Sequence, residues 1–175
     1  SWVPTYPNPA FEKMTMRDAY WGAKIVMSFS NEDLATMVAA GRYTEEPGAS
    51  AELTRLLAAR RDMVGRYYFA RVNPLDHFRV TRQGVSFRDL AIDGGLEMAD
   101  KTRYQLRWLD EQGKPTGSTK ELAATDFDVS DLPAGQFHGA ELRTDRGRGL
   151  SKATRVFFYF HDDGRAQLVR IDRET

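Results

Sequence analysis

The sequence lacks cysteine entirely, and histidine is scarce. Without cysteine the chain has no disulfides, no thiolate nucleophile and no zinc site built from thiolates. The three histidines, His77, His138 and His161, have none of the spacings, such as i and i+4, at which paired histidines bind a metal. We therefore expect neither a metal centre nor a cofactor.

The chain also lacks a surplus of charge of either sign. Lys plus Arg and Asp plus Glu both number 25, so the net charge is zero. Nucleic-acid-binding domains normally carry a basic surplus that neutralises phosphates, so a nucleic-acid partner is disfavoured, although a local basic patch stays open. No apolar run approaches the roughly 20 residues of a membrane-spanning helix, and we expect no membrane span. The printed chain shows no signal peptide.

The first part of the chain has a helical pattern. Residues 1–14 are rich in proline and predict an extended arm or linker, as in a segment of a longer protein. Residues 15–74 predict three helices, of which the first two begin at "TMRD" and "SNED", both in the form of capping boxes. The third helix should run from about Ser50 to about Val72, because the Asn-Pro pair that follows disfavours helix.

Residues 75–175 have the pattern of strands. Six stretches alternate or are rich in β-formers: "HFRV", "VSFRDLAI", "RYQLRWLD", "GAELRT", "RVFFYF" and "QLVRID". "DEQGKPTGS" is expected to be an exposed turn. Helices first and strands second, without βαβ alternation, indicate an α+β fold with an antiparallel sheet. We expect a sandwich or small barrel of about six or seven strands that packs with the helices as one compact unit, with two small domains as the alternative.

Tyr104, Leu106 and Trp108 alternate along one of these stretches and so share one face of a strand. The core is the default interpretation for that face, because a buried aromatic removes a large apolar area from water. The other face of a sandwich can carry aromatics that stack on sugars, and the pattern alone does not distinguish the two faces.

Several motifs resemble one protein group. "YPNPAF", "DAYWGAKIVMSFSNEDLATMVAAGRY", "ARRDMVGRYYFARVNPLDHFRV" and "VSFRDLAIDGGL", with the closing "LVRIDRE", are similar to the C-terminal region of a group of large uncharacterised exported bacterial proteins. In that group the region follows a segment that resembles a divergent HipA-like or lipid-kinase-like domain. The resemblance implies an accessory part of an exported bacterial protein, periplasmic or extracellular, and it implies no catalytic residues.

The stretch 60–80, "RRDMVGRYYFARVNPLDHFRV", combines arginine with aromatics. Its candidate ligand-binding residues are Arg60, Arg61, Arg66, Tyr67 and Arg71. In one interpretation they form a surface for anionic or planar ligands, nucleic acid included, through cation–π contacts. In the other, which we favour, the tyrosines pack inward as core and the arginines lie on a solvated flank near a helix C-terminus.

The carboxylates of "TDFDVSDL" are the best indication of an enzyme. Asp126 and Asp128, at i and i+2 of a strand, should point to the same face, where they could share a proton or bind Ca²⁺. With His138 as a further candidate they suggest a hydrolase with a carboxylate pair. The alternative is an exposed edge with solvated charges, and we favour it because most acidic loops hold no ligand.

These observations lead to one functional hypothesis and two alternatives. We expect a non-catalytic accessory or binding module of a larger exported bacterial protein, and its ligand would be a protein, its own upstream domain or an envelope glycan. The first alternative is the hydrolase with the carboxylate pair. The second is an anion or nucleic-acid binder that uses the arginine-rich helix end.

Overall fold

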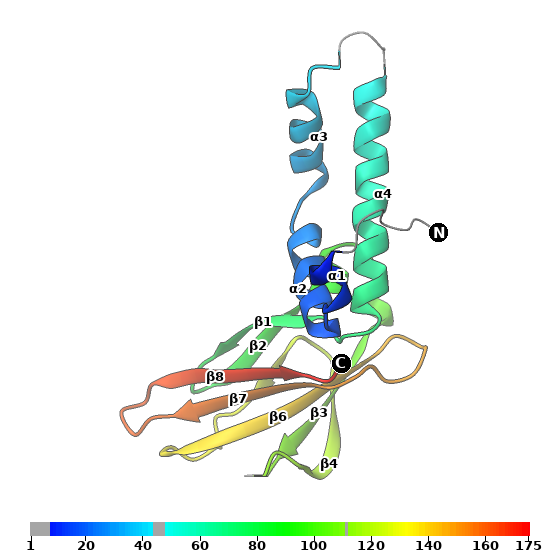
Figure 1. Cartoon of the computed structure of the whole chain (residues 1–175). Coiled ribbons are helices and arrows are strands. Elements are labelled where there is room, and N and C mark those ends of the chain that lie inside the picture. The colour runs from blue at the N-terminus through cyan, green and yellow to red at the C-terminus, as the bar shows by residue number, and fades with distance from the viewer. Residues whose placement is uncertain (1–7, 44–47, 111) are drawn as a thin grey trace. The chain divides into compact units, whose positions relative to one another are not determined.

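The computed structural model describes residues 8–43, 48–110 and 112–175. The chain divides into two compact units, Ser1–Tyr68 and Phe69–Thr175, which we describe one at a time. Helices come first and antiparallel strands follow, which confirms the α+β fold class (Figure 1). The expectation that helices and strands pack as one compact unit stays a prediction.

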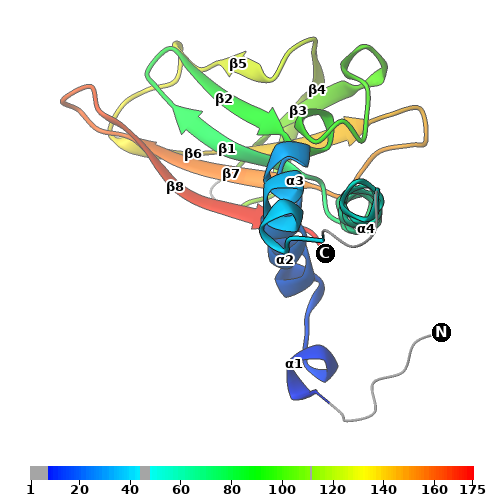
Figure 2. The ribbon, with the colours of Figure 1, turned by 90° about the horizontal axis from the view of Figure 1, so that it is seen from above.

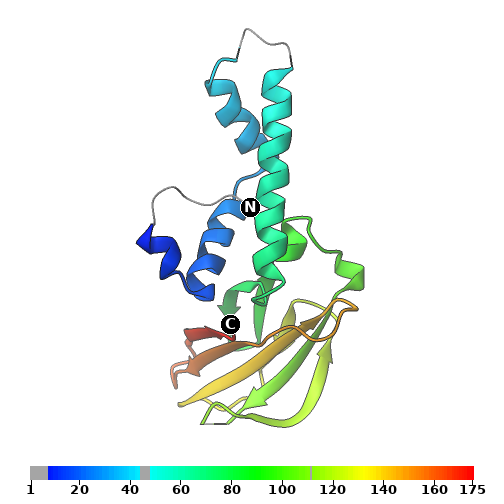
Figure 3. The ribbon, with the colours of Figure 1, turned by 45° about the vertical axis from the view of Figure 1, so that its right-hand side comes forward.

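Four helices precede the strands in the described residues. They are α1 (Pro9–Glu12), α2 (Met16–Met27), α3 (Asn31–Ala40) and α4 (Ala49–Phe69). α2 and α3 follow each other alongside α4 (Figures 1 and 3). Both predicted capping boxes are confirmed: Thr15 Oγ1 accepts a hydrogen bond from the Asp18 amide at 3.2 Å, and the Ser30–Asp33 pair repeats this arrangement.

Two helix boundaries differ from those expected. Residues 1–7 of the expected arm lie outside the described residues, but Pro9–Glu12 forms a helical turn instead of extended chain. α4 ends at Phe69, earlier than the expected Val72, and Val72 and Asn73 are buried beyond the end of the helix. No helix in the described part of the chain has the length and apolar character needed to cross a membrane.

Two antiparallel sheets make up the second unit and share one core, as in a sandwich (Figure 2). The smaller sheet has the order β1-β2-β5 and the larger has β4-β3-β6-β7-β8. The eight strands of the described residues are β1 (Leu75–Val80), β2 (Gly84–Asp89), β3 (Arg103–Leu109), β4 (Pro115–Leu122), β5 (Asp126–Asp128), β6 (Gln136–Asp145), β7 (Thr154–Phe160) and β8 (Ala166–Arg173).

Two stretches of this unit differ from their expected structure. β4 begins inside "DEQGKPTGS", which was expected to be a turn; the strand pairs with β3 alone and is exposed along most of its length. The end of the expected strand "VSFRDLAI" instead forms a short helix, α5 (Leu90–Asp93), because the Asp89 carboxylate accepts a hydrogen bond from the Ala91 amide and caps it. The described residues form eight strands, where about six or seven were expected.

The core lies between the two sheets and is filled by alternate residues of the strands. β7 shows the pattern most clearly: every other residue from Thr154 to Phe160 is buried, and those between are half-buried. Tyr104 and Leu106 are buried in the same core. Trp108 packs against it with its ring centroid 6.0 Å from that of Phe127. The core interpretation of that face of β3 is therefore confirmed.

Asn73 ties the start of the second unit to its larger sheet. The side-chain amide donates to the Leu142 carbonyl at 3.3 Å and accepts from the Thr144 hydroxyl at 2.9 Å. The Asn73 carbonyl accepts from the Thr154 hydroxyl at 3.3 Å. All of these polar groups are buried, so a lost partner would leave them without water to replace it.

We predict that Asn73→Ala lowers the free energy of unfolding of the strand unit by about 2–3 kcal/mol, because it orphans buried groups and opens a cavity. Urea unfolding followed by Trp108 fluorescence, in a protein whose Trp2 and Trp21 are replaced by Phe, measures the change. Gln83→Ala, on an exposed turn residue, is the control and should cost less than about 0.5 kcal/mol. Equal losses for the two variants would contradict the role assigned to Asn73.

A buried charge cluster joins the smaller sheet to the larger one. The Asp89 carboxylate, at the end of β2, accepts hydrogen bonds from the Tyr104 hydroxyl of β3 at 3.1 Å and from Arg146, which follows β6. Burial raises the pKa of Asp89, and the charge of Arg146 opposes that rise only in part. A carboxyl group with a raised folded-state pKa contributes stability that is complete below its unfolded pKa and is lost as the pH rises.

We predict that Arg146→Met raises the pKa of Asp89 further, because it removes the opposing positive charge. The deficit in unfolding free energy relative to the unaltered protein should therefore grow from pH 4, near the ordinary pKa of an aspartate, to pH 7. Urea unfolding at the two pH values and the carboxyl ¹³C titration of Asp89 measure both effects. A deficit that is the same at pH 4 and pH 7 would refute the coupling.

Candidate anion-binding site

The arginines of the helix end differ in their surroundings. Arg61 is withdrawn from the surface, because its guanidinium pairs with Asp62 at 2.7 Å and donates to the Phe29 carbonyl at 2.8 Å. Arg60 is exposed on α4, as is Arg66. Tyr67, which was expected to pack inward, is half exposed; Arg71 lies in the second unit.

The two aspartates of the hydrolase hypothesis lie on the same face, as predicted, but the structure does not bring His138 to them. Both are exposed on β5, on either side of the buried Phe127. Hydrogen bonds from Ser130 lower the pKa of Asp128, which marks it as a carboxylate held in a turn. In the described ranges, no three His, Asp or Glu side chains are grouped so that they could hold a metal ion.

His138 belongs to the other sheet and lies on its core side. Its ring centroid is 5.2 Å from that of Phe160 and 5.6 Å from that of Phe158. Its Nε2 lies 2.9 Å from the Pro133 carbonyl oxygen. The imidazole is therefore packed against aromatic rings of the core, whereas the aspartates face away from that core.

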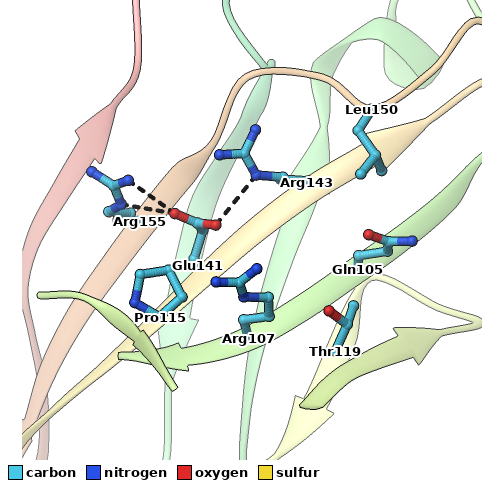
Figure 4. Close-up of a pocket in the computed structure, with 8 residues that line it drawn as sticks. All are labelled: Gln105, Arg107, Pro115, Thr119, Glu141, Arg143, Leu150 and Arg155. Carbon is cyan, nitrogen blue, oxygen red and sulfur yellow. Dashed lines mark hydrogen bonds and ion pairs between the residues drawn. The ribbon is translucent and has the colours of Figure 1, made fainter. Parts of the chain in front are cut away.

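A recess that was not predicted lies on the outward face of the larger sheet, opposite the core (Figure 4). Cross-strand pairing builds it: Arg107 of β3 pairs with Glu141 of β6, which pairs with Arg155 of β7. The recess measures about 350 Å³ and is lined by Gln105, Arg107, Pro115, Thr119, Glu141, Arg143, Leu150 and Arg155.

Glu141 is the centre of this recess. Its side chain is only 3% exposed, and Arg143 donates to one carboxylate oxygen from Nε at 3.2 Å. Arg155 donates to the other oxygen from Nε at 3.0 Å and from Nη2 at 2.9 Å. A buried carboxylate needs such partners, because desolvation costs several kcal/mol. Arg143 and Arg155 are therefore structural counterions of Glu141.

Arg143 is held by further groups. Its Nη1 donates to the Ser151 carbonyl at 3.1 Å, and its Nη2 lies 3.2 Å from a carboxylate oxygen of Glu174. The Ala153 amide holds the pKa of Glu174 below its usual value, so this carboxyl group is charged at neutral pH. The donors of Arg143 are thus largely engaged within the chain.

Arg107 differs from both of its neighbours. Its Nε is buried, yet neither that atom nor the rest of the side chain makes a hydrogen bond or ion pair with the described residues. Arg82 and Arg146 also carry a buried nitrogen without a partner, but each binds another group through a second nitrogen. Arg107 lines the recess, and its two Nη groups make no hydrogen bond with the described residues (Figure 4).

A β-bulge shapes the wall of the recess beside Arg107. The pairing of β3 with β4 shifts register between Leu106 and Trp108, so β4 carries extra residues at this point. Gly117 within them has a φ of 65°, which favours glycine. Bulges re-aim nearby side chains, and here Thr119 of β4 lines the recess.

The recess favours an anion over proton-transfer chemistry. Three arginines and one glutamate line it, which leaves two positive charges in excess, and Glu174 offsets a part of this through Arg143. Both oxygens of Glu141 accept from arginine, so that carboxylate is not a free base. No histidine or lysine of the described residues lines the recess. The arrangement can hold carboxylate or phosphate oxygens on Arg107, as guanidinium groups do.

A signal for this recess was present in the sequence. "RYQLRWLD", "GAELRT" and "RVFFYF" were predicted as strands, and the positions that alternate with their apolar residues hold Arg107, Glu141, Arg143 and Arg155. The period of two places these charges on one face. The sequence alone does not predict the strand register that places Arg107 and Arg155 on either side of Glu141.

Comparisons with protein-family models, with curated proteins and with solved structures gave no match. The function must therefore be argued from the geometry of the two units and from the chemistry of their side chains.

We predict that Arg155→Ala lowers the free energy of unfolding by about 2 kcal/mol, because it leaves a buried carboxylate with one arginine fewer. Arg107→Ala is the matched control: it removes the same residue type from the same cross-strand row, but no hydrogen bond within the described residues. It should cost less than about 1 kcal/mol. Urea unfolding measures both, and equal losses would mean that Arg107 is a structural residue.

Proposed function

We propose that this chain is a non-catalytic binding module that holds an anionic group in the recess on the outward face of its larger sheet. One observation carries the proposal: Arg107 has a buried Nε and no partner among the described residues, in a recess with an excess of positive charge. A buried polar atom without a partner costs free energy, and a bound ion or ligand that accepts from the same guanidinium is one way in which proteins offset that cost.

The chemistry of arginine supports an anionic ligand. A guanidinium group matches the two oxygens of a carboxylate, or two oxygens of a phosphate or sulfate, through parallel hydrogen bonds. Because the recess is partly walled by Pro115 and Leu150, these bonds form in surroundings less polar than water. Hydrogen bonds to Glu141 already hold the side chains of the two neighbouring arginines, so ligand binding does not have to order these side chains.

The cellular context in this proposal rests on the sequence resemblance alone. The chain would be an accessory part of a larger exported bacterial protein, in the periplasm or outside the cell. Its ligand would then be an envelope glycan or the acidic surface of a protein. We propose no second anion-binding site at the exposed arginines of α4, because Arg61, the central one, is already paired with Asp62.

We predict that sodium sulfate and sodium galacturonate shift the backbone amide resonances of β3 and β6, relative to sodium chloride at the same ionic strength. A single charged group on one guanidinium should bind with a dissociation constant in the millimolar range, or about −4 kcal/mol. Arg107→Gln should weaken this binding at least tenfold. Arg60→Gln, an exposed arginine on α4, is the matched control and should leave it unchanged.

Two outcomes would count against the proposal. Loss of binding in Arg60→Gln but not in Arg107→Gln would move the site to the helices. The absence of any saturable shift for both anions in the unaltered protein would reject an anion-binding module.

A further inference from the structure

The outward face of the larger sheet continues from the recess into a row of aromatic side chains. One step along the strands, Gly139 of β6 pairs with Phe157 of β7, and one step further Phe137 pairs with Tyr159. We call Phe137, Phe157 and Tyr159 the aromatic shelf. The recess and the shelf lie on one continuous face, because the alternate residues of β6 and β7 share it.

The rings of the aromatic shelf are accessible to a ligand. Phe137 is 69% exposed, which is unusual for a phenylalanine, and its ring centroid lies 4.8 Å from that of Tyr159. The Tyr159 ring in turn meets His161 at 4.8 Å, edge to face. The Phe137 and Tyr159 rings are tilted by 57° to each other, so each presents its own apolar face, and rings held by their neighbours lose little conformational freedom when a partner stacks on them.

Gly139 is the residue that joins the shelf to the recess. A Cβ atom at this position would lie 3.1 Å from the Phe157 ring and 3.1 Å from the Leu109 Cβ. The Phe157 ring therefore lies close over the bare backbone, and Leu109 approaches from β3. Gly139 itself adds no side chain between the recess and the shelf, and the space beside it is taken by Phe157 and Leu109.

The spacing of the two features sets the length of the ligand. Glu141 in the recess and Phe137 on the shelf are four residues apart along β6, which corresponds to about 13 Å. At this end of the sheet lies a second recess of about 960 Å³, which is lined both by outward residues such as Phe137 and Tyr159 and by the core-side His138. A ligand that uses both features needs an anionic group and apolar planar faces that are about 13 Å apart.

The charges on this face separate the classes of ligand. Glu141 is paired with Arg143 and Arg155, and Asp172 is paired with Arg170. Arg107 is therefore the arginine of the recess that no side chain of the described residues engages, whereas nucleic acids gain most of their affinity from many phosphate contacts. A uronic-acid sugar presents one carboxylate, hydroxyl groups that donate to protein oxygens, and a face of C–H bonds that stacks on an aromatic ring. Gln105 and Thr119 add neutral hydrogen-bonding groups beside Arg107.

We infer that the ligand is an acidic saccharide of several uronic-acid units, which places one carboxylate on Arg107 and the following sugar rings on the aromatic shelf. This inference rests on the proposed function, because it names the substrate class of the same recess. In this inference, stacking on the aromatic shelf supplies most of the affinity, and Arg107 recognises the negative charge.

The test compares galacturonate oligomers of one to six units by calorimetry and by amide resonance titration on the unaltered protein. The hexamer should bind at least tenfold more tightly than the monomer, and the fully methyl-esterified hexamer, which lacks the charge, should bind at least tenfold more weakly than the free acid. Phe137→Ala and Tyr159→Ala should remove most of the gain with length and leave monomer binding within twofold. Val169→Ala, an exposed apolar residue of β8 outside the shelf, is the matched control and should change neither.

The outcomes distinguish this inference from the function on which it rests. Monomer binding that depends on Arg107 but does not strengthen with length would overturn the saccharide inference and leave the anion-binding module intact. Loss of all binding, monomer included, would overturn both. A six-residue single-stranded oligothymidylate that binds as tightly as the hexamer at the same ionic strength would also overturn the inference, since the face would then recognise a polyphosphate.

Discussion

Burial of one face of the larger sheet is the constraint on which the rest of the second unit depends. Because side chains alternate along a strand, the burial of Val156, Phe158 and Phe160 in the core forces Arg155, Phe157 and Tyr159 to the outward face. A register shift of one residue would exchange the two sets and place charges in the core. The recess and the aromatic shelf are thus consequences of the same hydrophobic alternation that forms the sandwich.

The buried charges of this unit divide into two kinds. Asp89 is enclosed by Arg146, Tyr104 and the start of α5, and its donors all come from within the chain. Glu141 is equally well satisfied, but its arrangement leaves Arg107 beside it without a partner among the described residues. The first cluster therefore links the two sheets through groups within the chain, whereas the second presents a cation to the exterior.

The sequence predicted those parts of the fold that depend on local patterns. The capping boxes at Thr15 and Ser30 and the alternation in β7 involve residues close together in the chain, and their physical causes are visible there. β4 was missed because an exposed edge strand with the sequence "PTGSTKEL" has neither apolar alternation nor β-branched enrichment. α4 ends earlier than expected, and beyond its end Val72 and Asn73 are buried by tertiary contacts that local propensity does not contain.

The candidate site was the least predictable part, for a related reason. The arginines of the helix end attracted notice because they are close in sequence, whereas Arg107, Glu141 and Arg155 come from three strands and meet only through cross-strand register. The Nε–H resonance of Arg107, followed by ¹H–¹⁵N spectroscopy during titration with sodium galacturonate, tests the central claim most directly. The account predicts a saturable shift of this resonance, larger than those of Arg143 and Arg155, whose Nε atoms already donate to Glu141. A resonance that stays in place while an arginine of α4 shifts would contradict it.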